Sequence, residues 1–180
     1  MSLHLNEAIT TMKTDTPPEY WLRGPVHDVP DLLQPVAHAL LQAQEEIHEM
    51  MGDFPERLLW ERPVGCAATG FHLRHMAGVL DRLFTYARGE ALSRQQLAYL
   101  GEEGNPQEDV SVAFLLMVLD AQLAKSIDQL RGTDPQTLTQ TRTVGRLQLP
   151  STVMGLLFHA AEHTMRHTGQ LLVTVRVLKT

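Results

Sequence analysis

Apolar residues recur every three or four positions in four long stretches of the chain, which is the spacing of amphipathic α-helices. This pattern predicts four long helices, over residues 31–51, 70–88, 107–130 and 151–178. Thr69 and Ser151 stand at the starts of the second and fourth helices and are their expected N-caps. Gly89 and Gly132 follow the second and third helices, where glycine commonly ends a helix. Four such helices predict an all-α four-helix bundle.

Shorter elements connect the predicted helices. Residues 93–100 form a short extra helix capped by Ser93, and the glycine and proline of residues 101–106 break it. Residues 133–149 alternate weakly between polar and apolar side chains, which predicts either an extended loop or a small hairpin turning near Gly145. Residues 1–29 are polar and contain prolines, so we expect an irregular lead-in with a helical turn around residues 5–12.

Composition narrows the class of protein. The 180 residues and 43% hydrophobic content suit a single domain, 1–180, with one buried core. The net charge is −6 and the 15 lysines and arginines are scattered, which disfavours nucleic-acid binding. The single cysteine, Cys66, excludes an internal disulfide and suits a reducing compartment. Residues 1–16 lack a secretory pattern, and the longest uncharged apolar run, 110–119, is about half a membrane span, so we expect a cytoplasmic protein without a membrane partner.

The last predicted helix carries a stripe of histidines. His159, His163 and His167 are four residues apart and Gln170 follows three residues later, so all four share one helix face. Two imidazoles at this spacing can chelate one divalent ion. Eight residues of helix separate His159 from His167 by about 12 Å, which is too far for all three to share an ion. One adjacent pair is therefore the candidate, with a further ligand from another helix.

A second pair of histidines, His72 and His75, lies on one side of the second predicted helix. One of them, with His163 and His167, would give a three-histidine set that leaves positions open for water or substrate, as in catalytic metal sites. Zinc, nickel, iron and manganese are all candidates, because imidazole discriminates weakly among them. The alternative is that the histidines are ordinary core or interface residues without a metal.

Two segments resemble a known family: GFHLRHMA at residues 70–77 and HAAEHTMRHTGQ at residues 159–170. They resemble segments of the DinB-like proteins, which share a four-helix fold with the bacillithiol and mycothiol transferases. The resemblance extends over residues 30–178, and its most specific element is the final His-x-x-x-His-x-Gly-Gln pattern. It implies that the helices of the bundle follow an up-down-down-up order.

The resemblance also implies a metal site made of His75, His163 and His167, for which His72 is a rival to His75. His159 and Gln170 are then expected to contact a ligand histidine or to line the pocket. The implied function is that of a divalent-metal-dependent enzyme, a thiol transferase or a related enzyme whose substrate is a small molecule such as a low-molecular-weight thiol. The alternative is a non-catalytic, stress-related bundle that binds a metal or a ligand. Broad apolar faces on several helices favour a homodimer.

Overall fold

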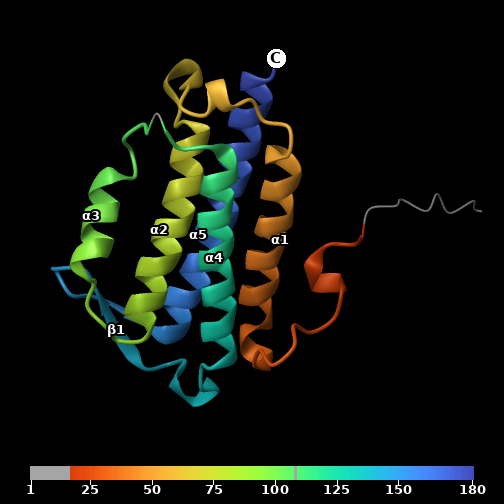
Figure 1. Cartoon of the computed structure of the whole chain (residues 1–180). Helices are drawn as coiled ribbons and strands as arrows, with labels where there is room; N and C mark the ends of the chain where they lie inside the picture. The colour runs from red at the N-terminus through yellow and green to blue at the C-terminus, as the bar shows by residue number, and fades with distance from the viewer. Residues whose placement is uncertain (1–16, 108) are drawn as a thin grey trace, which may run out of the picture.

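The computed structural model of the chain describes residues 17–107 and 109–180. Within them lie five α-helices and a two-stranded antiparallel sheet (Figure 1). The helices are α1 (Gln34–Met51), α2 (Thr69–Ala87), α3 (Arg94–Glu102), α4 (Val112–Arg131) and α5 (Val153–Leu178). The all-α bundle with one short extra helix is therefore confirmed. The turn expected around residues 5–12 lies outside the described residues.

The four long helices form a bundle in which α1 and α2 lie on opposite corners. α2 packs against α4 and α5, and α1 packs against the same two helices. In Figure 1, α1 and α5 run upward whereas α2 and α4 run downward, which is the up-down-down-up order. Because α2 and α4 run in the same direction, a long connection must return the chain to the top of the bundle, and this connection contains α3. α2 and α5 are thus antiparallel neighbours.

A core of aliphatic side chains fixes the positions of these helices. Residues without exposed surface include Leu40, Ile47, Leu73, Leu80, Leu130 and Leu157. Burying each such side chain contributes about 1.5–3 kcal/mol, so the packing of α2 against α5 is well determined. Of the described helices, none combines the length and the apolar character needed to cross a bilayer.

The starts of α2 and α4 differ from the sequence predictions. α2 begins at Thr69 itself, after Ala68, so the Thr69 hydroxyl is buried without a hydrogen-bond partner among the described residues instead of capping the helix. α4 begins at Val112 and not at residue 107. Ser111 caps it by accepting a hydrogen bond from the backbone N–H of Phe114, which satisfies a donor that the first turn leaves free.

The hairpin before the last helix is present and changes where that helix begins. β1 (Thr141–Val144) pairs with β2 (Leu149–Thr152), and Gly145 in the turn has a φ of +68°. Ser151 pairs with Arg142 inside the hairpin, so it cannot be the N-cap of α5. Thr152 takes that role and accepts a hydrogen bond from the backbone N–H of Gly155.

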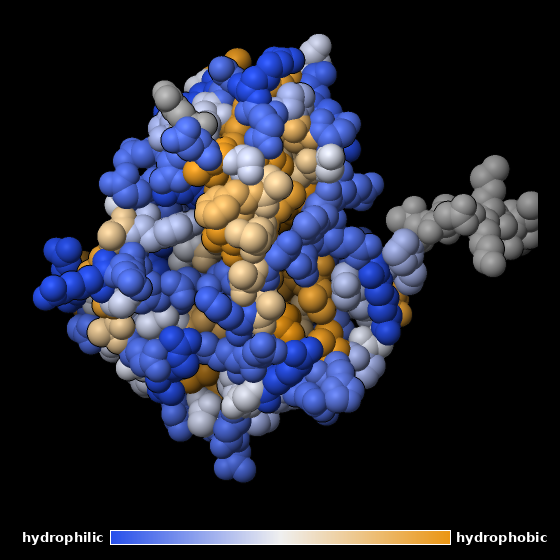
Figure 2. All heavy atoms as spheres, viewed as in Figure 1, coloured by the Kyte–Doolittle hydropathy of each residue, from blue (hydrophilic) through white to orange (hydrophobic). Residues whose placement is uncertain are grey.

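One apolar surface remains uncovered on α4. Phe114 and Met117 are 48% and 57% exposed, and Ala121 and Ala124 continue the same helix face as exposed residues. Figure 2 shows an orange band in the middle of the visible surface, where α4 lies in Figure 1. This α4 stripe (Phe114, Met117, Ala121 and Ala124) contributes nothing to the core of its own bundle.

Candidate metal centre

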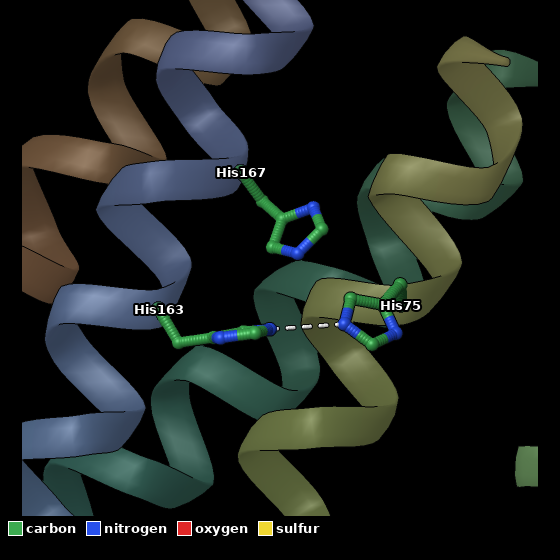
Figure 3. Close-up of side chains that lie close together, drawn as sticks. All are labelled: His75, His163 and His167. Carbon is green, nitrogen blue, oxygen red and sulfur yellow. Dashed lines mark hydrogen bonds between the residues drawn. The ribbon is translucent and has the colours of Figure 1, made fainter. Parts of the chain in front are cut away.

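Three histidines from two helices meet between α2 and α5. His75 comes from α2, and His163 and His167 come from successive turns of α5. One ring nitrogen from each lies within 4.8 Å of the other two. The Nε2 atoms of His75 and His163 are 3.0 Å apart, and Figure 3 shows the three rings turned toward one another. The structure therefore brings together the three residues that the resemblance implied.

The spacing of these nitrogens suits a shared divalent ion. Two nitrogens that each lie about 2.05 Å from one ion are about 2.9 Å apart at a right angle and about 3.3 Å apart at a tetrahedral angle. The 3.0 Å separation of His75 Nε2 and His163 Nε2 falls in this range. Imidazole nitrogens are also donors that zinc, iron and nickel accept. The separation of the His75 and His163 nitrogens and the chemistry of all three donors thus fit a divalent metal.

A buried carboxylate holds His75 in the required orientation. The Nδ1 atom of His75 lies 2.9 Å from a carboxylate oxygen of Glu103, the residue that follows α3. Because a carboxylate only accepts hydrogen bonds, Nδ1 carries the proton and Nε2 presents its lone pair to the other histidines. Arg82 on α2 forms a buried ion pair with the same carboxylate. This arrangement of carboxylate and histidine is the one that commonly orients a metal ligand.

Glu103 is ionised in this environment. Burial raises its pKa, but hydrogen bonds from His75 and Arg82, together with the charge of Arg82, lower it by more, so its pKa lies below its ordinary value. Gly78 makes the approach possible, since a Cβ atom there would overlap Oε1 of Glu103. Arg74 holds the segment around Glu103 in place by donating hydrogen bonds to the backbone carbonyls of Glu102 and Asn105.

His72 supports His167 and does not join the group of three. The two Nδ1 atoms are 3.0 Å apart, so one proton lies between them. This contact leaves Nε2 of His167 to face His75 and His163 (Figure 3). Burial and the charge of His75 lower the pKa of His72 to about 4. Burial and the neighbouring histidines lower the pKa of His167 to about 3, so both rings are neutral near pH 7.

The family model of the DinB superfamily matches residues 39–171. The chain belongs to the DinB superfamily. The crystal structure of a conserved protein from Enterococcus faecalis is similar, with a TM-score of 0.64 and 18% sequence identity over 82% of this chain and 96% of that chain. At this identity the likeness shows the fold alone, and no curated protein matches the chain.

The resemblance to the DinB-like proteins drawn from the two histidine segments is therefore confirmed. The two other residues expected at the site, His159 and Gln170, lie on the exposed side of α5, and the ring of His159 is 5.3 Å from that of His163. His159 is exposed, and its Nδ1 lies 2.6 Å from Glu162, which also forms an ion pair with Arg166. Gln170 is exposed, and no hydrogen bond among the described residues joins it to a ligand histidine. Both side chains extend the histidine stripe onto the outer surface of this DinB-superfamily protein.

Sequence reasoning missed Glu103 and Phe71. Glu103 lies between Glu102 and Gly104 in an acidic connection, and no local pattern distinguishes it from its neighbour. Phe71 fits the apolar pattern of α2, yet its ring stacks on the imidazole of His75 with centroids 5.1 Å apart and an angle of 14°. The ring is also 6.3 Å from that of His167, so Phe71 covers one side of the candidate metal centre.

Proposed function

We propose that this DinB-superfamily protein is a divalent-metal-dependent enzyme whose ion is held by His75, His163 and His167. The observation that carries the proposal is the convergence of three imidazoles from two helices within 4.8 Å, one of them fixed by a buried carboxylate. Neutral ligands leave the positive charge of an ion largely available to a substrate. A divalent ion in such a site lowers the pKa of a bound thiol or water and so supplies a nucleophile at neutral pH.

We propose a low-molecular-weight thiol as the substrate class and thiol S-transfer as the reaction. The thiol loses its proton, its sulfur forms a bond to an electrophilic carbon of a second substrate, and the leaving group on that carbon departs with the bonding electron pair. The chain's own residues would prepare this chemistry. Glu103 keeps the proton of His75 on Nδ1, and His72 contacts Nδ1 of His167, so His75 and His167 each present Nε2. Phe71 shields one side of the site from water.

The metal content of the purified protein tests the proposed metal site. We expect about one divalent ion per chain in the parent and none in the variant in which all three ligands are alanine. The matched control removes three other histidines, through His27→Ala, His38→Ala and His48→Ala, and should keep the ion. Equal metal content in the two triple variants would contradict the proposal.

Cobalt substitution tests whether a thiol binds at the metal site, as the proposed substrate must. We expect 2-mercaptoethanol added to the cobalt-loaded protein to produce a charge-transfer absorption band from thiolate to cobalt, whereas ethylene glycol produces none. Cobalt binding without this band would refute the thiol proposal and leave a metal-binding bundle, the non-catalytic alternative. Absence of cobalt binding would refute the metal centre itself.

We also propose that the α4 stripe is where two copies of the chain form a homodimer. The stripe is bulky at one end, with Phe114 and Met117, and small at the other, with Ala121 and Ala124. Antiparallel packing about a twofold axis would set each bulky end against the small end of the partner copy. Light scattering should give the mass of a dimer for the parent and of a monomer for Ala121→Glu. Phe158→Glu, at an exposed position on α5, should remain dimeric, and a monomeric parent would overturn the proposal.

A further inference from the structure

A small cavity lies next to the candidate metal centre, and none of the three histidines lines it. Its volume is about 270 Å³, and it lies between the connection that precedes α2, the start of α2 and the connection that follows α3. It is lined by Trp60, Arg62, Ala67, Ala68, Phe71 and the turn containing Gly104 and Pro106. This volume is just under the range of roughly 300–1,000 Å³ for small-molecule sites, so it suits a ligand of about one ring and one polar group.

One wall of the cavity is a tryptophan held in a fixed position. Trp60 donates a hydrogen bond from Nε1 to the backbone carbonyl of Gln107, at 3.0 Å. Its ring lies against Gly70, where an added Cβ atom would come within 2.7–2.9 Å of three ring carbons. Only glycine permits this contact without a shift of the ring, so the sequence of α2 sets the position of Trp60.

A second wall belongs to both the cavity and the metal centre. Phe71 lines the cavity, and its ring also stacks on the imidazole of His75 at a centroid distance of 5.1 Å. The rings of His72 and Phe71 are 5.6 Å apart. A molecule in the cavity would therefore touch the aromatic ring that covers the three histidines. Two aromatic walls and two alanines favour a flat, apolar body.

The cavity also contains one positive charge. Arg62 donates from Nε to the carbonyl of Cys66 at 3.3 Å, which leaves its two terminal amino groups free of any other hydrogen bond among the described residues. None of the ion pairs in the described part of the chain involves Arg62. A guanidinium with two free terminal amino groups suits a carboxylate ligand, because the two carboxylate oxygens can each accept a hydrogen bond from the guanidinium at once.

We infer that this cavity binds a small planar carboxylate, with its flat body between Trp60 and Phe71 and its carboxylate on Arg62. The role of this ligand as a substrate, or as part of one, rests on the proposed function, because Phe71 links the cavity to the metal centre. The binding itself does not rest on it and is measured without turnover.

Titration with benzoate tests the inference in the full chain. The sequence has two tryptophans, and Trp21 is 63% exposed, so a Trp21→Phe background leaves Trp60 as the reporter of binding by fluorescence. We expect a saturable change with benzoate, and weaker binding of benzyl alcohol, which has the ring without the charge. Arg62→Gln should raise the dissociation constant of benzoate about fivefold and leave that of benzyl alcohol unchanged. The matched control, Arg57→Gln, removes an exposed arginine of the same connection that does not line the cavity and should bind benzoate like the parent.

Three outcomes would overturn the inference. They are a fluorescence change that never saturates, equal benzoate affinity in parent and Arg62→Gln, and loss of benzoate binding in the triple alanine variant of the metal ligands. The last would mean that benzoate binds at the metal centre itself. Zinc content, measured on the same samples, reports separately on the proposed function, so failure of one idea is distinguishable from failure of the other.

Discussion

Replacing Glu103 by glutamine should weaken the metal centre without removing any of its ligands. The carboxylate accepts a hydrogen bond from Nδ1 of His75 at 2.9 Å and pairs with Arg82 inside the protein. Glu103→Gln keeps the size of the side chain but removes the charge that fixes the proton of His75. Loss of such support typically costs 10–100-fold in metal affinity, or about 1.4–2.8 kcal/mol.

The same substitution should also destabilise the fold, because it leaves Arg82 as a buried cation without its partner. Breaking a buried ion pair costs about 3–5 kcal/mol, and we expect the free energy of unfolding to fall by an amount near the lower end of that range. Arg82→Met combined with Glu103→Gln removes the unpaired charge. This double variant should regain most of the stability but none of the zinc affinity, which separates the two effects.

The assay is a zinc competition titration at a temperature where every variant is folded, with urea unfolding measured in parallel. Glu102→Gln is the control, since this exposed side chain accepts a hydrogen bond from Asn105 and, among the described residues, contacts none of the three histidines by a hydrogen bond. Gly78→Ala should lower zinc affinity because the added Cβ overlaps Oε1 of Glu103 and displaces the carboxylate, while its charge is kept. Unchanged zinc affinity in Glu103→Gln would refute the assigned role of this residue.

Further predictions concern how side-chain packing and zinc binding affect the free energy of unfolding. Gly70→Ala should lower the free energy of unfolding by about 1–3 kcal/mol and shift the fluorescence of Trp60, because the added methyl overlaps its ring. Gly169→Ala, on α5 with open space at its Cβ, should instead raise the free energy of unfolding by about 0.5–1 kcal/mol in the same urea measurement. Leu80→Ala should cost about 2–5 kcal/mol, whereas Leu97→Ala, 47% exposed, should change stability by less than about 0.5 kcal/mol. Free zinc at about a thousand times its dissociation constant should raise the free energy of unfolding by about 4 kcal/mol, and calorimetry should find no such gain in the triple alanine variant of the ligands.

Local patterns in the sequence determined the positions of the long helices and the placement of two candidate metal ligands, His163 and His167, on one helix face. The three-to-four spacing of apolar residues depends only on the geometry of one helix. It therefore locates α1, α2, α4 and α5 without any information on the contacts between helices. The four-residue spacing of His163 and His167 likewise places both imidazoles on one face of α5. The helix starts also depend on tertiary structure, because the neighbouring residues Ser151 and Thr152 can both cap α5 and the hairpin decides between them.

Packing between helices decided everything that involves residues far apart in the chain. His72 and His75 are three residues apart on one side of α2, and only the rotation of α2 against α5 sets His75 against His163 and His72 behind His167. Glu103 reaches His75 because the α3 connection folds back over Gly78, a contact that no periodicity in either segment encodes. The spacing of residues along one helix is fixed by its backbone hydrogen bonds, whereas contacts between helices depend on how all their side chains fill the core together.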